Sequence, residues 1–177
     1  MIKLIQKIKN KRESGNIVDA MGSLFVVILL FAMILVMAAY GSLVEKKLAI
    51  DNTVKEYLYL EEQYGYLRGA PSELPKSYTC SNGVINTSGL AAGSDAENLV
   101  RDLCTNNGVT KVIIESGTTR VQQAYGNEVV LKVTVTFNNP IFKEVGTNSK
   151  NGPGLFKVFG LKQEITYTIE YKATSRW

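Results

Sequence analysis

The feature that most constrains this chain is an uncharged stretch near its start, from Ala20 to Val44. These 25 residues include no charged side chain, and every residue from Leu24 to Ala39 is apolar. A helix rises about 1.5 Å per residue, so the stretch would reach roughly 37 Å, whereas the hydrocarbon core of a bilayer is about 30 Å thick. A helix in a soluble core would need a polar face, which this stretch lacks. The sequence therefore predicts a membrane anchor.

The charges on either side of the anchor predict its orientation. Residues 1–16 contain five basic side chains and one acidic side chain, and a short basic flank of this kind stays in the cytoplasm. We therefore expect a cytoplasmic leader at residues 1–16, a transmembrane segment at about 20–44 and an extracytoplasmic C-terminal body. A cleaved secretory signal is the alternative, because residues 39–41 could serve as a cleavage site, although the apolar run is longer than usual.

The anchor helix is predicted to continue outside the membrane as an amphipathic helix over residues 45–68, so that one helix covers residues 17–68. Gly69 followed by Pro71 is a stop signal. Apolar residues recur at helical spacing along this half; they are Leu43, Ile50, Val54, Tyr57, Leu60, Tyr64 and Leu67. We expect this stripe to be buried against the protein's own body, with a neighbouring subunit as the alternative. The adjacent Glu61 and Glu62 are expected on the solvated face.

The remainder, residues 69–177, is predicted to form an extracytoplasmic α+β head. Residues 94–107 form a short helix that starts with a capping box of Ser94 and Glu97. Three antiparallel strands or more are expected, because residues 109–116, 128–138 and 162–173 are β-branched or alternate between apolar and polar. Residues 70–93 are expected to be an irregular loop. Within it, the triplet at residues 86–88 (Asn-Thr-Ser) fits an N-glycosylation sequon, a pattern that also arises often by chance.

The head contains both cysteines of the chain, Cys80 and Cys104. An even number of cysteines outside the cytosol indicates a disulfide, which would attach the irregular loop to the short helix. Two buried thiols are the alternative.

The residue types of the chain argue against an enzyme. It contains no histidine, which excludes nucleophile–histidine pairs and imidazole metal sites. No phosphate-binding glycine motif is present, so we expect no cofactor, no metal and no small-molecule substrate. The charge after residue 42 is nearly balanced, with 15 basic and 14 acidic residues. This balance leaves no basic patch outside the leader, and we expect no nucleic-acid partner.

The connection at residues 139–160 between the two longest predicted strands is unusually apolar. Hairpin loops normally have two to five polar residues, whereas this one contains a group of large apolar side chains that includes Phe142, Leu155, Phe156 and Phe159. Either these side chains fold back over the sheet, or they form a contact patch for a partner or the outer leaflet.

The order of these parts resembles a type IV pilin-like subunit. It has a basic leader, a small-residue junction at residues 13–16, the acidic Asp19, one apolar helix that becomes amphipathic, and an α+β head that ends in paired strands. The pattern is most similar to the TadE-like pseudopilins of tight-adherence (Flp-type) pili and related conjugative-element systems. The similarity includes the endings VTVTFNNPIF at residues 133–142 and LKQEITYTIEYKATSR at residues 161–176.

The resemblance implies that a prepilin-type peptidase removes the leader at the junction of Ser14, Gly15 and Asn16. In that family a glutamate at mature position five neutralises the N-terminal amine of a neighbouring subunit. Cleavage after Ser14 would place Asp19 fifth, and cleavage after Gly15 would place it fourth. The chain departs from the pattern in residue type, because an aspartate replaces the glutamate, and with the second cleavage also in spacing. Asp19 would either pair with a neighbouring subunit or cap the helix at the membrane interface.

These expectations combine into one prediction of function. The chain would be a membrane-anchored structural subunit for a pilus, secretion or conjugation apparatus, at the cell surface when assembled. Its anchor would pack against itself or other pilin-like subunits through small positions such as Ala38 and Ser42. The alternative is a single-span extracytoplasmic binding or accessory protein that never enters a filament.

Overall fold

The computed structural model describes residues 2–81, 84–139 and 164–177, and for residues 2–18 and 81 it describes the backbone only. The described elements, in chain order, are α1 (Ile2–Tyr64), β1 (Lys76–Ser81), β2 (Val84–Ile85), α2 (Asp95–Thr105), β3 (Val109–Ile114), β4 (Glu128–Asn138) and β5 (Glu164–Thr174). The chain divides into two compact units, Met1–Gly41 and Ser42–Trp177. The second unit is the α+β head, and it begins within α1.

The strands of the head form one antiparallel sheet in the order β2-β1-β3-β4-β5. The longest pairing joins β4 to β5, from Glu128 opposite Thr174 to Asn138 opposite Glu164 without a shift in register. Alternation along β4 favours this register, because all of its apolar residues except Val130 fall on one face. These residues are fully buried: Val129, Leu131, Val133, Val135 and Phe137. The predicted alternation of β4 and β5 is confirmed.

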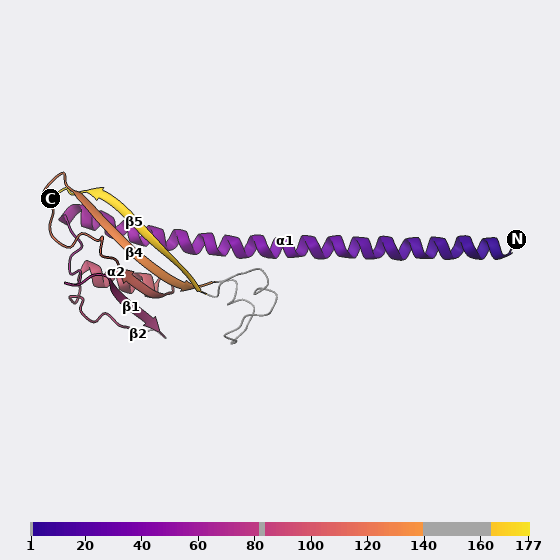
Figure 1. Cartoon of the computed structure of the whole chain (residues 1–177), viewed down its shortest axis with the longest axis horizontal. Helices are drawn as coiled ribbons and strands as arrows, with labels where there is room; N and C mark the ends of the chain where they lie inside the picture. Colours follow the sequence, from indigo (N-terminus) through magenta and orange to yellow (C-terminus); the bar gives the residue numbers. More distant parts are fainter. Residues whose placement is uncertain (1, 82–83, 140–163) are drawn as a thin grey trace. The chain divides into compact units, whose positions relative to one another are not determined.

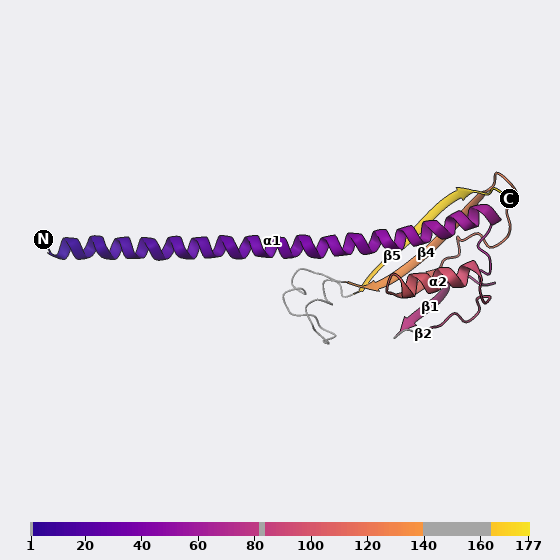
Figure 2. The same cartoon turned by 180° about the vertical axis from the view of Figure 1, so that it is seen from behind.

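Both helices of the head cover the same face of this sheet (Figures 1 and 2). The part of α1 within the head, from Ser42 to Tyr64, lies along β4 and β5, while α2 lies against β3. One core joins the two helices to the sheet; its helical members are Ile50, Val54, Tyr57, Ala96, Leu99, Val100 and Leu103. The stripe of α1 is therefore buried in the protein's own head, as the favoured interpretation expects.

The start of α2 is fixed by the predicted capping box. The Ser94 side chain accepts a hydrogen bond from the Glu97 amide, and the Glu97 carboxylate accepts one of 2.6 Å from the Gly93 amide. The first bond satisfies an amide of the first helical turn. The second satisfies the amide of Gly93, the residue before the N-cap, while the Ser94 amide donates to the Ala91 carbonyl. The helix ends at Thr105, close to the predicted end.

The helix α1 ends earlier than predicted, at Tyr64 instead of Arg68. Gly65 has a φ of +76°, a left-handed conformation that ends helices and that other residues adopt at a cost. A β-carbon at this position would lie 2.7 Å from the Gln123 carbonyl oxygen. The chain must therefore turn at Gly65 and keep a glycine there.

The interpretation of residues 70–93 as an irregular loop is wrong. This region contains β1, which pairs with β3 from Lys76 opposite Ile114 to Thr79 opposite Lys111, and the short β2. The prediction of three antiparallel strands or more is confirmed, but it placed no strand in this region. The six residues of β1 have only a weak strand pattern of their own, and their conformation depends on pairing with a strand about 30 residues later.

Candidate functional site

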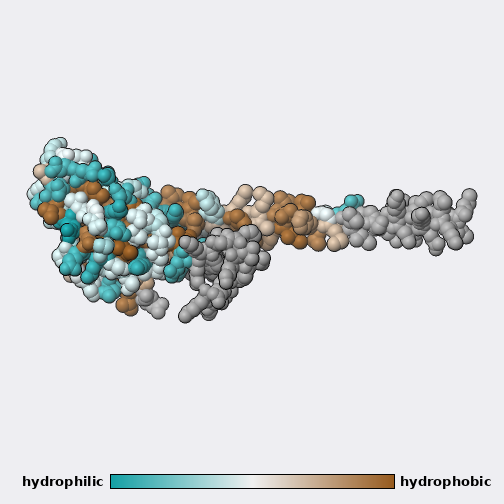
Figure 3. Space-filling model, viewed as in Figure 1, coloured by the Kyte–Doolittle hydropathy of each residue, from teal (hydrophilic) through white to brown (hydrophobic). Residues whose placement is uncertain are grey.

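The apolar segment of α1 is the first candidate feature of functional importance. The stretch from Asp19 onward in α1 is long and apolar enough to cross a membrane by length and composition, and none of its most apolar window is buried. Figure 3 shows mostly apolar side chains along the visible part of this segment. Exposure of so many large side chains on a helix is typical of a surface that meets lipid or other helices rather than water.

The predicted contact residues of this segment all lie in α1. Asp19 and Ala38 are exposed, and Ser42, one turn after Ala38, is half-buried. The exposed Ser23 hydroxyl donates to the Ala20 carbonyl at 2.9 Å. Residues 14–16, the predicted cleavage junction, have a helical backbone within α1. The structure therefore leaves Asp19 and Ala38 accessible for contacts between helices.

The part of α1 within the head contacts the sheet through lysines that lie over aromatic rings. The Lys46 ammonium lies 4.9 Å from the ring centroid of Phe137, and that of Lys47 lies 4.7 Å from Tyr167. Lys55 lies 5.3 Å from the Tyr171 ring. These contacts are favourable because a cation is attracted to the face of an aromatic ring. They allow a helix with a charged surface to pack closely on the tyrosine-rich face of β5.

Two hydrogen bonds attach α1 to α2 and to the turn that follows α2. The Tyr57 hydroxyl donates to the Asp102 carboxylate at 2.5 Å, and the Asn107 amide donates to the Thr53 hydroxyl at 2.8 Å. Burial and the neighbouring Asp102 carboxylate raise the pKa of Tyr57, so the phenol stays protonated and remains a donor. The two helices are thus held together by polar contacts as well as by the core.

A disulfide joins Cys80 on β1 to Cys104 on α2, with their α-carbons 5.8 Å apart. This is the predicted pairing. It differs from the expectation in one respect, because Cys80 belongs to a strand of the sheet and not to an irregular loop. The bond therefore connects β1, the strand next to the edge strand β2, to the helix α2.

Glu61 contradicts the expectation of a solvated face for Glu61 and Glu62. Its side chain is only 1% exposed, and neither carboxylate oxygen has a hydrogen-bond partner within the described residues. Burial raises its pKa to about 9, so the group is a neutral acid at pH 7. Glu62 is different, because its carboxylate accepts a hydrogen bond from Arg176 at 2.8 Å and is partly exposed.

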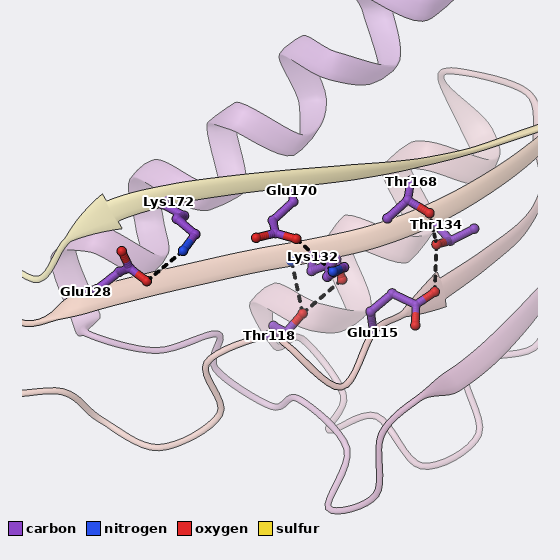
Figure 4. Close-up of polar contacts among 8 residues, drawn as sticks. All are labelled: Glu115, Thr118, Glu128, Lys132, Thr134, Thr168, Glu170 and Lys172. Carbon is purple, nitrogen blue, oxygen red and sulfur yellow. Dashed lines mark hydrogen bonds and ion pairs between the residues drawn. The ribbon is translucent and has the colours of Figure 1, made fainter.

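The opposite face of the sheet is polar and carries a ladder of cross-strand contacts (Figure 4). The Lys132 ammonium lies 2.7 Å from the Glu170 carboxylate, and that of Lys172 lies 3.0 Å from the Glu128 carboxylate. The Glu170 ion pair lowers the pKa of this carboxyl and raises that of Lys132. Thr134 donates to Glu115 at 2.6 Å and also contacts the Thr168 hydroxyl at 2.8 Å. Hydroxyls and ion pairs of this face are therefore mutually satisfied.

The predicted apolar contact patch of Phe142, Leu155, Phe156 and Phe159 lies outside the described residues. Within residues 19–81, 84–139 and 164–177, no group of three or more His, Cys, Asp or Glu side chains is placed to hold a metal ion.

Sequence reasoning missed Glu61, although a signal for it was present. Ile50, Val54 and Tyr57 define a stripe whose next member, four residues later, is residue 61. The charged residue type outweighed this spacing in the prediction. Comparison with known proteins adds no further assignment, since no family model, curated protein or solved structure matches the chain.

Proposed function

We propose that this protein is a membrane-anchored, pilin-like structural subunit of a pilus, secretion or conjugation apparatus. The observation that carries the proposal is the composition of α1. One uninterrupted helix, Ile2–Tyr64, contains a fully exposed apolar stretch and, further along, residues that are buried in the core of the head. A subunit that is held in a membrane by one helix and presents a small head outside it needs such a helix.

The basic residues before the apolar stretch of α1 support a cytoplasmic N-terminus. Residues 1–16 have five basic side chains against one acidic side chain. The disulfide between Cys80 and Cys104 supports a head on the oxidising side of the membrane. In this arrangement, the segment at residues 20–44 spans the bilayer.

The anchor would contact other subunits through its exposed side chains. Lipid tails provide no hydrophobic driving force for helix association, so it depends on close packing. Small residues such as Ala38 and Ser42 allow helices to approach closely. Asp19 would pair with the new N-terminal amine of a neighbouring subunit after a peptidase removes the leader, because a carboxylate in a membrane is costly unless it is paired.

Mass spectrometry of the protein extracted from membranes tests the proposal directly. A mature chain that begins at Gly15 or Asn16 is the expected result. Asp19→Asn is the matched variant, because it removes the charge and keeps the size of the side chain. It should leave processing intact and reduce crosslinking between anchors, measured with a cysteine introduced at Ala38.

Other outcomes would contradict the proposal. An intact N-terminus beginning at Met1, together with no crosslinks between anchors, would indicate a single-span accessory protein. A head that proteases reach only after the cells are opened would contradict the orientation. An unprocessed chain that still crosslinks through residue 38 would keep the assembly role and remove the peptidase from it.

A further inference from the structure

We infer that Asn86 is an acceptor for an N-linked oligosaccharide, because the structure presents its amide and the Ser88 hydroxyl together at the surface of the head. The inference rests on the proposed function, since oligosaccharide transfer to asparagine takes place on the outer side of a membrane. The triplet Asn86-Thr87-Ser88 is the sole Asn-X-Ser/Thr triplet with X other than proline in the sequence, and this triplet is the acceptor motif.

The side chains of the triplet are arranged for recognition. The Ser88 hydroxyl donates to the Asn86 side-chain oxygen at 2.5 Å, and the Ser88 backbone amide donates to the same oxygen at 3.1 Å. A backbone N–H can only donate, so these bonds identify the oxygen of the Asn86 amide and leave its nitrogen on the other side. No hydrogen bond from that nitrogen is formed within the described residues. Asn86 and Ser88 are both exposed.

The middle residue of the triplet points the other way. Thr87 is partly buried, and its hydroxyl is among the groups that lower the pKa of the Glu97 carboxyl at the start of α2. A turn follows, in which the Leu90 amide donates to the Thr87 carbonyl at 3.0 Å and Gly89 adopts a φ of +89°. The triplet is therefore held at the surface by its centre, while its two outer side chains face solvent.

The transfer reaction itself is balanced without a redox step. The Asn86 nitrogen forms a bond to the anomeric carbon of a lipid-diphosphate-linked oligosaccharide. The bond between that carbon and the diphosphate oxygen breaks, and the lipid diphosphate leaves with the electron pair. The amide gives up one proton to a base of the transferring enzyme. The remaining N–H keeps Asn86 an uncharged secondary amide.

A glycan at this position would be compatible with the fold. Asn86 directly follows β2, the edge strand of the sheet, and no core residue of the head lies within the triplet. A bulky, hydrophilic substituent at this edge would also block the pairing of β2 with strands of other molecules, which is a recognised hazard of exposed edges.

The test uses the full-length protein purified from the membranes of the cells that produce it. After reduction of the Cys80–Cys104 bond, trypsin releases the triplet in one peptide, Ser77–Arg101, and fragmentation locates an added glycan mass on Asn86. Three variants accompany the wild type. Asn86→Gln and Ser88→Ala should abolish the glycopeptide. Ser88→Thr should retain it, because threonine keeps the hydroxyl of the motif.

Surface proteolysis of intact cells, run in parallel, separates the two proposals. An unmodified Asn86 in a head that external protease cleaves would overturn the glycan and leave the pilin-like function standing. A head that is protected in intact cells would overturn both. A glycan that persists in the Asn86→Gln variant would place the sugar elsewhere and also overturn this inference. Retention of the Cys80–Cys104 bond in each variant shows that the head has folded.

Discussion

Glu61 has the most buried carboxyl group in the part of the chain that the structure describes. Its carboxyl group is neutral when the protein is folded, with a pKa near 9, and is ionised above about pH 4.5 when the chain is unfolded. Between these two values the unfolded state binds fewer protons than the folded state. The free energy of unfolding must therefore fall as the pH rises, by about 1.4 kcal/mol per pH unit.

This linkage predicts the behaviour of Glu61→Gln, which keeps the size of the side chain and cannot ionise. The wild type should lose about 3 kcal/mol of stability relative to the variant between pH 5 and pH 7. Urea unfolding of the full-length protein in detergent at several pH values measures the difference. Glu62→Gln is the control, because Glu62 is partly exposed and paired with Arg176. Parallel stability curves for wild type and Glu61→Gln would contradict the prediction.

Arg68 provides a second prediction at the residue scale. Its guanidinium donates two hydrogen bonds to Asp95, at 2.6 and 2.8 Å, and lies 3.9 Å from the centre of the Tyr64 ring. Asp95 is nearly buried. Lysine keeps the charge but cannot make the paired bonds or the stacked contact. Arg68→Lys should therefore lower the free energy of unfolding by about 1–2 kcal/mol, measured against Arg101→Lys, whose single ion pair is more exposed.

At the scale of elements, β4 is longer than β3, one of its two neighbouring strands. β3 pairs with β4 between Val109 and Ile114, and the segment after β3 continues the contact with side chains. The Thr118 hydroxyl donates to the Lys132 carbonyl at 2.9 Å and accepts from the Lys132 amide at 3.1 Å. A buried threonine thus replaces the missing backbone partner of β4 (Figure 4).

Replacing this hydroxyl should weaken the sheet. Thr118→Val has nearly the same shape but leaves the Lys132 amide unpaired, which should cost about 1–3 kcal/mol. Thr118→Ser keeps both bonds and should lose less. Chemical unfolding of the three proteins measures the effect. If Val and Ser variants were equally stable, the side-chain hydrogen bonds would not contribute to holding β4.

The disulfide acts between elements, so its removal should affect the whole head. The two cysteines are separated by 24 positions, and closing a loop of this length stabilises by about 3 kcal/mol in the chain-entropy model. The double variant Cys80→Ser and Cys104→Ser should show this loss in thermal unfolding. Reduction of the wild type should produce the same loss. A reduced protein with unchanged stability would contradict the prediction.

At the scale of the whole molecule, the head should fold without the first unit. A chain that begins at Ser42 keeps Ile50, Val54 and Tyr57, which are all buried in the core. It should be water-soluble and disulfide-bonded and should unfold cooperatively. A chain that begins at Leu58 lacks these three side chains and should aggregate, because its sheet has lost part of its cover. Circular dichroism and sedimentation measure both outcomes.

The sequence was sufficient for features whose cause is local. The spacing of apolar residues in α1, the cap of α2 and the alternation along β4 and β5 each follow from neighbouring residues, and all three are present in the structure. Glu61 and β1 were missed because distant residues determine their environment. Partners from other parts of the chain bury Glu61, and β1 is a strand because β3 lies beside it. Local patterns cannot report such partners.

The disulfide also has a mechanical consequence. A tensile load that enters the head at β1 passes to α2 through a covalent bond, and from α2 to α1 through the core and the hydrogen bonds of Tyr57 and Asn107. The contacts between α2 and α1 are non-covalent, so this junction should separate before the disulfide breaks. Under rising force, α2 should separate from α1 while the disulfide keeps it attached to β1.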